Sequence, residues 1–203
     1  TVPSAVWDAL TVTNPYENDW FAGTLTLENA HAPELLPWGG AHLRVLGENT
    51  VDGTLGGTGL LFTGGGSLAA GELNVWAWGS VRAPLLAVRD GADVRCGALH
   101  MGSNAEEKGT LLVESGSLTV GGEFWLQNAA LTVTGGELTL AGDASIDRGE
   151  VHISGGTVSF EHGLWLGEGD IVITGGTVIV PGGEAGLTAE NGKVTISGGA
   201  VRE

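Results

Sequence analysis

The residues of this chain that could carry out chemistry are mostly carboxylates. Asp and Glu total 24 against 8 Lys and Arg, which gives a formal net charge of −16. Carboxylates paired on neighbouring elements could cleave glycans by general acid–base catalysis, and clustered carboxylates could bind Ca²⁺. The acids of the second half fall in expected turns or at strand starts: Glu137, Asp143, Asp147, Glu150, Glu168, Asp170 and Glu184. We interpret them as solvated turn residues, with a Ca²⁺ near Glu168 and Asp170 as the alternative.

The remaining polar groups predict no catalytic centre and no cofactor. The five histidines share no metal-ligand spacing such as HxxxH: His31, His42, His100, His152 and His162. The glycine-rich segment 56–66 lacks the GK[ST] ending of a phosphate-binding loop, and the calcium-binding repeat GGxGxDxUx is absent. Cys96 is the only cysteine and alternates with Val94, so we expect a buried, inert thiol. We therefore predict a chain that is not an enzyme.

Tryptophan is the other residue type with a functional pattern. In the segments 124–126 and 164–166, alternation turns Trp125 and Trp165 outward between inward Phe and Leu residues. The repeat register places them in one column: His100, Trp125, Ser145, Trp165 and Gly186. The full candidate contact surface is Trp76, Trp78, Trp125, Trp165, Val172 and Ile179. An aligned aromatic stripe indicates a contact, and its occupant is a covering loop, another copy of the chain or a sugar chain.

A repeat of about twenty residues must position these side chains. Pairs of glycines recur at 135–136, 155–156, 175–176 and 198–199, and Ser115-Gly116 is a weaker copy. Apolar residues alternate before and after each pair, as in VHISGGTVSF at 151–160, which is typical of strands. A fixed period of this length indicates a solenoid, and three short strands per period leave no room for a helix.

The predicted fold is therefore all-β, a parallel β-helix solenoid with three short strands per coil of about 20 residues and the usual right-handed crossover. A β-hairpin around each glycine pair is the alternative. The predicted inward columns include Val113, Val133, Ile153, Ile173 and Ile196. We expect the glycine pairs to turn a corner that requires positive φ: Gly135, Gly136, Gly155, Gly156, Gly175, Gly176, Gly198 and Gly199.

The two ends of the chain differ from the middle. Residues 1–40 are rich in aromatic residues and proline, and we predict a divergent first coil plus a cap there, with β-helix coils over 41–203 that are most regular over 110–203. The last coil lacks a cap, so the sequence is a piece of a longer solenoid, a neighbouring copy covers the coil, or the charges of Arg202 and Glu203 protect it. The candidate end-to-end contact residues are Trp7, Trp20, Phe21, Val194, Ile196 and Val201.

Charge and hydropathy narrow the partners. A net charge of −16 repels phosphate backbones, so we predict no nucleic-acid binding. No apolar stretch approaches the roughly 18 residues of a membrane helix, so we predict no membrane insertion.

The repeat style "ISGGT-V-V…LWLG-G…I-ITGGTV" resembles the Gly/Thr-rich repeats of secreted bacterial β-helices, among them autotransporter passenger domains and the autotransporter-like repeat proteins of planctomycetes and verrucomicrobia. Residues 110–201 carry the resemblance clearly and 41–109 weakly. It implies a secreted, non-catalytic solenoid located outside the cell or at its surface. We accordingly expect an extracellular structural solenoid that self-associates head to tail into filaments or a surface layer. The alternative is a carbohydrate-binding surface adhesin that uses the tryptophan stripe.

Overall fold

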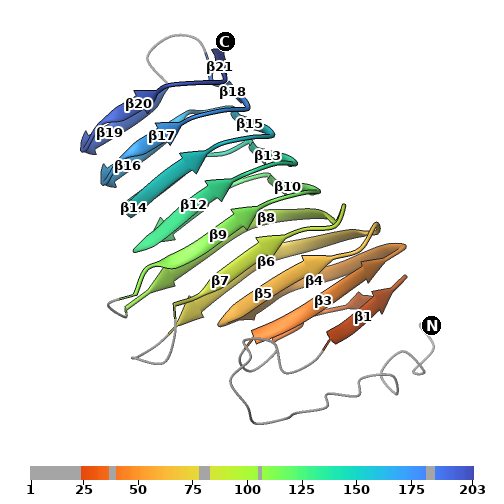
Figure 1. Ribbon diagram of the computed structural model, residues 1–203. Helices are drawn as coiled ribbons and strands as arrows, with labels where there is room; N and C mark the ends of the chain where they lie inside the picture. The colour runs from red at the N-terminus through yellow and green to blue at the C-terminus, as the bar shows by residue number, and fades with distance from the viewer. Residues whose placement is uncertain (1–23, 37–39, 78–82, 105–106, 182–185) are drawn as a thin grey trace.

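The computed structural model describes residues 24–36, 40–77, 83–104, 107–181 and 186–203. Within these ranges every regular element is a strand and the paired strands run parallel. Figure 1 shows the strands stacked coil upon coil, from β1 near the N-terminus to β19, β20 and β21 near the C-terminus. The predicted β-solenoid with coils of about 20 residues is therefore confirmed.

The first strands of successive coils stack into one sheet. Its members are β1 (Thr24–Glu28), β3 (Gly40–Leu46), β5 (Gly59–Thr63), β7 (Leu85–Val88), β9 (Gly109–Val113), β12 (Ala129–Val133), the second half of β14 (Ala144–Ile153), β17 (Ile171–Ile173) and β20 (Val194–Ile196).

The second and third strands of the coils form the remaining faces. Upstream they are continuous in β4 (Glu48–Gly57), β6 (Ser67–Ala77) and β8 (Asp93–Ser103), which follow the short β2 (His31–Ala32). Downstream the second strands are β10 (Ser117–Val120), β13 (Glu137–Leu140), β15 (Thr157–Phe160), β18 (Thr177–Ile179) and β21 (Ala200–Arg202). The third strands are β11 (Phe124–Gln127), the first half of β14, β16 (Leu164–Glu168) and β19 (Leu187–Asn191).

Alternation along each strand fills the interior with stacked columns. The predicted column is present in register: Val113, Val133, Ile153, Ile173 and Ile196. All but the last of these are at most 1% exposed, and each such side chain contributes about 1.5–3 kcal/mol of transfer free energy. Cys96 stacks on Val120 as predicted, and burial raises the pKa of its thiol to about 12.

The glycine pairs have two different roles, which corrects the prediction that both need positive φ. Gly156 has φ of 72°, in the left-handed region that glycine adopts without steric cost. Gly155 is outside that region, but a Cβ there would collide with the carbonyl oxygen of Thr134 in the preceding coil. The first glycine is therefore required by the close stacking of coils and the second by the corner. The same division holds for the pairs Gly135-Gly136, Gly175-Gly176 and Gly198-Gly199.

At the C-terminal end of the described structure the inward columns are uncovered. Val194, Ile196 and Val201 are 40%, 54% and 38% exposed, although their partners Ile171, Ile173 and Val178 are fully buried. The aromatic residues predicted to contact such an end, Trp7, Trp20 and Phe21, lie outside the described residues, as does most of the predicted cap. Residues 24–36 already stack as a coil on β3 and β4.

Candidate ligand-binding face

The outward side of the third strands carries one continuous polar and aromatic column. In register it consists of Asn74, His100, Trp125, Ser145, Trp165 and Thr188. The predicted alignment of Trp125 and Trp165 is confirmed, and the last member is corrected from Gly186 to Thr188. The step from Trp165 to the next coil is 23 residues because the coil is longer there, and alternation alone did not locate the extra residues.

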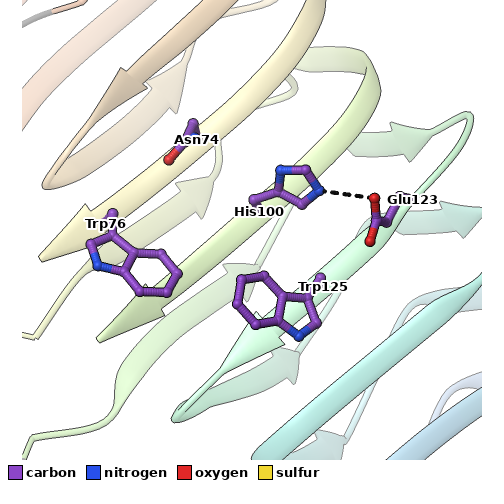
Figure 2. A pocket seen from close by; sticks show the side chains of 5 residues that line it. All are labelled: Asn74, Trp76, His100, Glu123 and Trp125. Atoms are coloured by element: carbon purple, nitrogen blue, oxygen red, sulfur yellow. Dashed lines mark ion pairs between the residues drawn. The ribbon is translucent and has the colours of Figure 1, made fainter. Parts of the chain in front are cut away.

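Trp76 joins this column from the neighbouring position on β6. Its Cα partner is Gly102 on β8, and a Cβ on Gly102 would collide with the indole ring of Trp76. The ring therefore lies across the bare backbone of Gly102 and reaches Trp125 of the following coil. The two indole centroids are 5.8 Å apart and the ring planes differ by 23°. Figure 2 shows the two rings side by side, so that they form one aromatic platform.

A charged cluster borders the platform. The His100 ring lies edge-on to Trp125 with centroids 6.3 Å apart. Its Nδ1 is 3.1 Å from Oε1 of Glu72 and its Nε2 is 3.3 Å from Oε2 of Glu123, the pair marked in Figure 2. Asn74 donates from Nδ2 to Glu72 Oε1 at 3.1 Å. Together Asn74, Trp76, His100, Glu123 and Trp125 line a shallow pocket that is open to solvent.

A second shallow pocket continues the face two coils further on. Trp165 is 40% exposed, and its ring leans over Gly167 on the same strand. Ser145 and Thr188 flank it in the column, and Asp143 and His162 line the edge with Asp143 Oδ1 3.4 Å from His162 Nδ1. Two strand spacings, about 9.6 Å, separate Trp125 from Trp165. The face therefore offers two aromatic surfaces in line along the solenoid axis.

Sequence reasoning missed the carboxylates of this face. It examined the outward columns of the first and second strands, whereas Glu72 and Glu123 belong to the third. Glu123 was within reach, since it lies two residues before the outward Trp125 and so shares its face. Glu72 was not, because the offset between coils upstream is 26 residues from Leu61 to Ala87 and 25 from Ala87 to Leu112, so the register of twenty does not extend there.

Not all predicted contact residues belong to this face. Val172 lies outward on β17 and Ile179, which is 37% exposed, on β18, so each occupies a different face of the coil from the tryptophans. Trp78 lies outside the described residues. The candidate contact surface thus reduces to Trp76, Trp125 and Trp165.

The acids considered for Ca²⁺ have other partners. Arg148 Nε donates to Glu168 Oε2 at 2.9 Å, and the backbone N–H of Lys193 donates to Asp170 Oδ1 at 3.1 Å. Glu150 accepts from Lys108 Nζ at 2.7 Å and lies 3.0 Å from His152 Nε2, and these contacts, the lysine first, lower its pKa to about 2. Among the described residues no three His, Cys, Asp or Glu side chains are placed to hold a metal ion.

Comparison with known proteins leaves the face to be interpreted on its own geometry. No family model, curated protein or solved structure matches the chain. In the described ranges no helix is long and apolar enough to cross a membrane.

Proposed function

We propose that this solenoid binds carbohydrate on the outward face of its third strands, without cleaving it. The observation that carries the proposal is the platform of Trp76 and Trp125 bordered by His100, Glu123 and Asn74. One face of a pyranose ring presents C–H groups that pack on an indole, while its edge presents hydroxyl groups. Aromatic side chains with a few placed polar groups supply both kinds of contact.

The surroundings of the two glutamates support binding over catalysis. Glu72 and Glu123 both contact the same imidazole, so His100 occupies the space between them that a scissile bond would need. The pocket is shallow and open, whereas glycan hydrolysis relies on a site that excludes water from its carboxylates. The extracellular or surface location that we propose with this function rests on the resemblance of the repeats.

Intrinsic tryptophan fluorescence during titration with oligosaccharides tests the proposal. Trp125→Ala should abolish the response and Trp76→Ala should reduce affinity at least tenfold. Val172→Ala changes an outward apolar residue on another face and is the matched control, which should bind as the parent does. If a broad panel of neutral and charged oligosaccharides leaves the fluorescence of the parent unchanged, carbohydrate binding is refuted.

A second function, end-to-end self-association, is favoured by the uncovered apolar columns at β20 and β21. Val194, Ile196 and Val201 are the most exposed members of columns that are buried elsewhere. Among the described strands, β20 and β21 pair on one side only, with β17 and β18, which leaves backbone groups for another strand. We propose a second copy of the chain as the occupant, in a heterologous contact that propagates.

Sedimentation at several concentrations tests this association. The parent should form species larger than a monomer, and Ile196→Lys should remove them while the upstream coils keep their circular dichroism signal, because solenoid coils depend mainly on their neighbours. Ile179→Lys, on the outward side of β18, is the control for an added charge. A parent that stays monomeric at all concentrations would show that this edge does not bind another copy.

A further inference from the structure

We propose that the ligand of this face is an extended polymer of amino sugars, carrying protonated amines and lying along the solenoid axis. This inference rests on the carbohydrate-binding function proposed above and names the class of sugar. It follows from three features of the face: the direction of the aromatic column, the carboxylates beside it, and the charge of the whole chain.

The aromatic column sets the shape of the ligand. Trp125, Ser145 and Trp165 occupy successive strands in register, so a large ring, a small side chain and a second large ring follow one another along the axis. The spacing of about 9.6 Å between the two indoles is close to the length of two units of an extended pyranose chain. A β-linked polymer repeats its orientation every two units, so alternate sugars would present the same face to Trp125 and Trp165.

The carboxylates set its charge. Glu123 and Asp143 are adjacent in the stack, since the backbone N–H of Phe124 donates to the Asp143 carbonyl at 3.0 Å. Their side chains are 67% and 96% exposed, and each lines one of the two pockets. Like charges on neighbouring strands repel each other, and a cation placed between them relieves the repulsion.

The resident partners of these two carboxylates do not satisfy them. Among the described residues the ion-pair partners are histidines, His100 at 3.3 Å and His162 at 3.4 Å, and no Lys or Arg pairs with either acid. The remaining capacity of both carboxylates points toward the strip between Trp125 and Trp165. With a net charge of −16, the chain repels uronic acids and sulfated glycans and attracts a polymer of ammonium groups.

Calorimetric titration of the full chain with two hexasaccharides tests the inference. The probes are β-1,4-linked hexamers of glucosamine and of N-acetylglucosamine, used at a pH where the free amines are protonated. Ion pairs with two exposed carboxylates, each giving about threefold, predict that the glucosamine hexamer binds about tenfold tighter at low salt. The difference should narrow as the salt concentration rises, because salt screens exposed charges.

Four variants locate the effect. Glu123→Gln and Asp143→Asn should each lower affinity for the glucosamine hexamer about threefold and leave the acetylated hexamer unchanged. Trp165→Ala should weaken both hexamers. Glu137→Gln removes an exposed carboxylate from β13, on another face, and should change neither.

The outcomes separate the two proposals. If both hexamers bind equally to the parent, the preference for amino sugars is wrong and the carbohydrate-binding function stands. If Glu137→Gln weakens the glucosamine hexamer as much as Asp143→Asn does, the attraction is a general effect of the negative surface and the inference is overturned. If neither hexamer binds and the wider panel also fails, both proposals fall.

Discussion

Replacing Gly102 by Ala should dismantle the aromatic platform while leaving the solenoid folded. Gly102 lies directly under the Trp76 ring, and a new Cβ would collide with the far edge of the indole. Its φ is outside the left-handed region, so the backbone accepts alanine. The indole of Trp76 can move away by rotating its side chain, which costs far less than moving backbone. The expected result is a Trp76 ring displaced from Trp125.

The size of the effect follows from what is lost. An aromatic pair contributes about 0.5–1.5 kcal/mol beyond its buried area, so Gly102→Ala should destabilise the fold by about 1 kcal/mol. In a chain of 203 residues this corresponds to a fall in Tm of about 2–4 °C. A sugar ring that packs across both indoles would lose half of its platform, and its affinity should fall about tenfold, which is equivalent to about 1.4 kcal/mol.

Two measurements with one control decide the outcome. The far-UV circular dichroism couplet of the interacting indoles should disappear, and Tm should be compared with that of Gly65→Ala. Gly65 also lies outside the left-handed region, and a Cβ there has nothing within 4 Å, so this control should match the parent. A Gly102→Ala variant that keeps the couplet and binds oligosaccharide like the parent would refute the platform as the binding surface.

The regular half of the solenoid could be predicted residue by residue because two periodicities agree there. Alternation tells which side chains point inward, and the constant step of twenty residues tells which of them stack. Hence the column from Val113 to Ile196 and the outward alignment of Trp125 with Trp165 are both as predicted. The prediction of Thr188 failed where the step lengthens, because alternation does not say where an insertion is accommodated.

The stack of Trp76 on Trp125 was beyond sequence reasoning for a different reason. It joins residues 49 positions apart that are two strands apart in the sheet, with Gly102 between them. Upstream coils are 25 or 26 residues long, so their register with the downstream coils is fixed by pairing within β8, which spans two segments of its coil. A glycine in register beside an outward tryptophan was the available signal, and it becomes meaningful only once the pairing is known.

Three further predictions test the interior, the corners and the surface electrostatics. Gly156→Val should lower stability by several kcal/mol, because a β-branched residue is strained at φ of 72°, and Gly155→Val should do the same through collision with the Thr134 carbonyl; thermal melts in which either variant matches the parent would contradict the role assigned to that glycine. Cys96 should resist alkylation in the native protein and react on unfolding, since burial raises the pKa of its thiol to about 12; rapid labelling at neutral pH in the absence of denaturant would be inconsistent with its place in the core. The last prediction concerns Glu150, whose pKa is lowered from 4.5 to about 2, chiefly by Lys108 reaching across the intervening coil. A carboxylate whose pKa is lower in the folded state stabilises the fold above its unfolded value and loses that contribution as pH falls through the folded value. The side chains of both partners are 44% exposed, so solvent screening limits the contribution to about 1 kcal/mol or less. The difference in Tm between the parent and Glu150→Gln should therefore be constant from pH 7 to about pH 5 and shrink between about pH 4.5 and pH 2. Lys108→Gln should reproduce this pH dependence, because it removes the same ion pair from the other side, whereas Glu137→Gln should differ from the parent by a constant amount over that interval. A Glu150→Gln difference that instead persists undiminished to pH 2 would mean that the ion pair with Lys108 does not stabilise the folded chain.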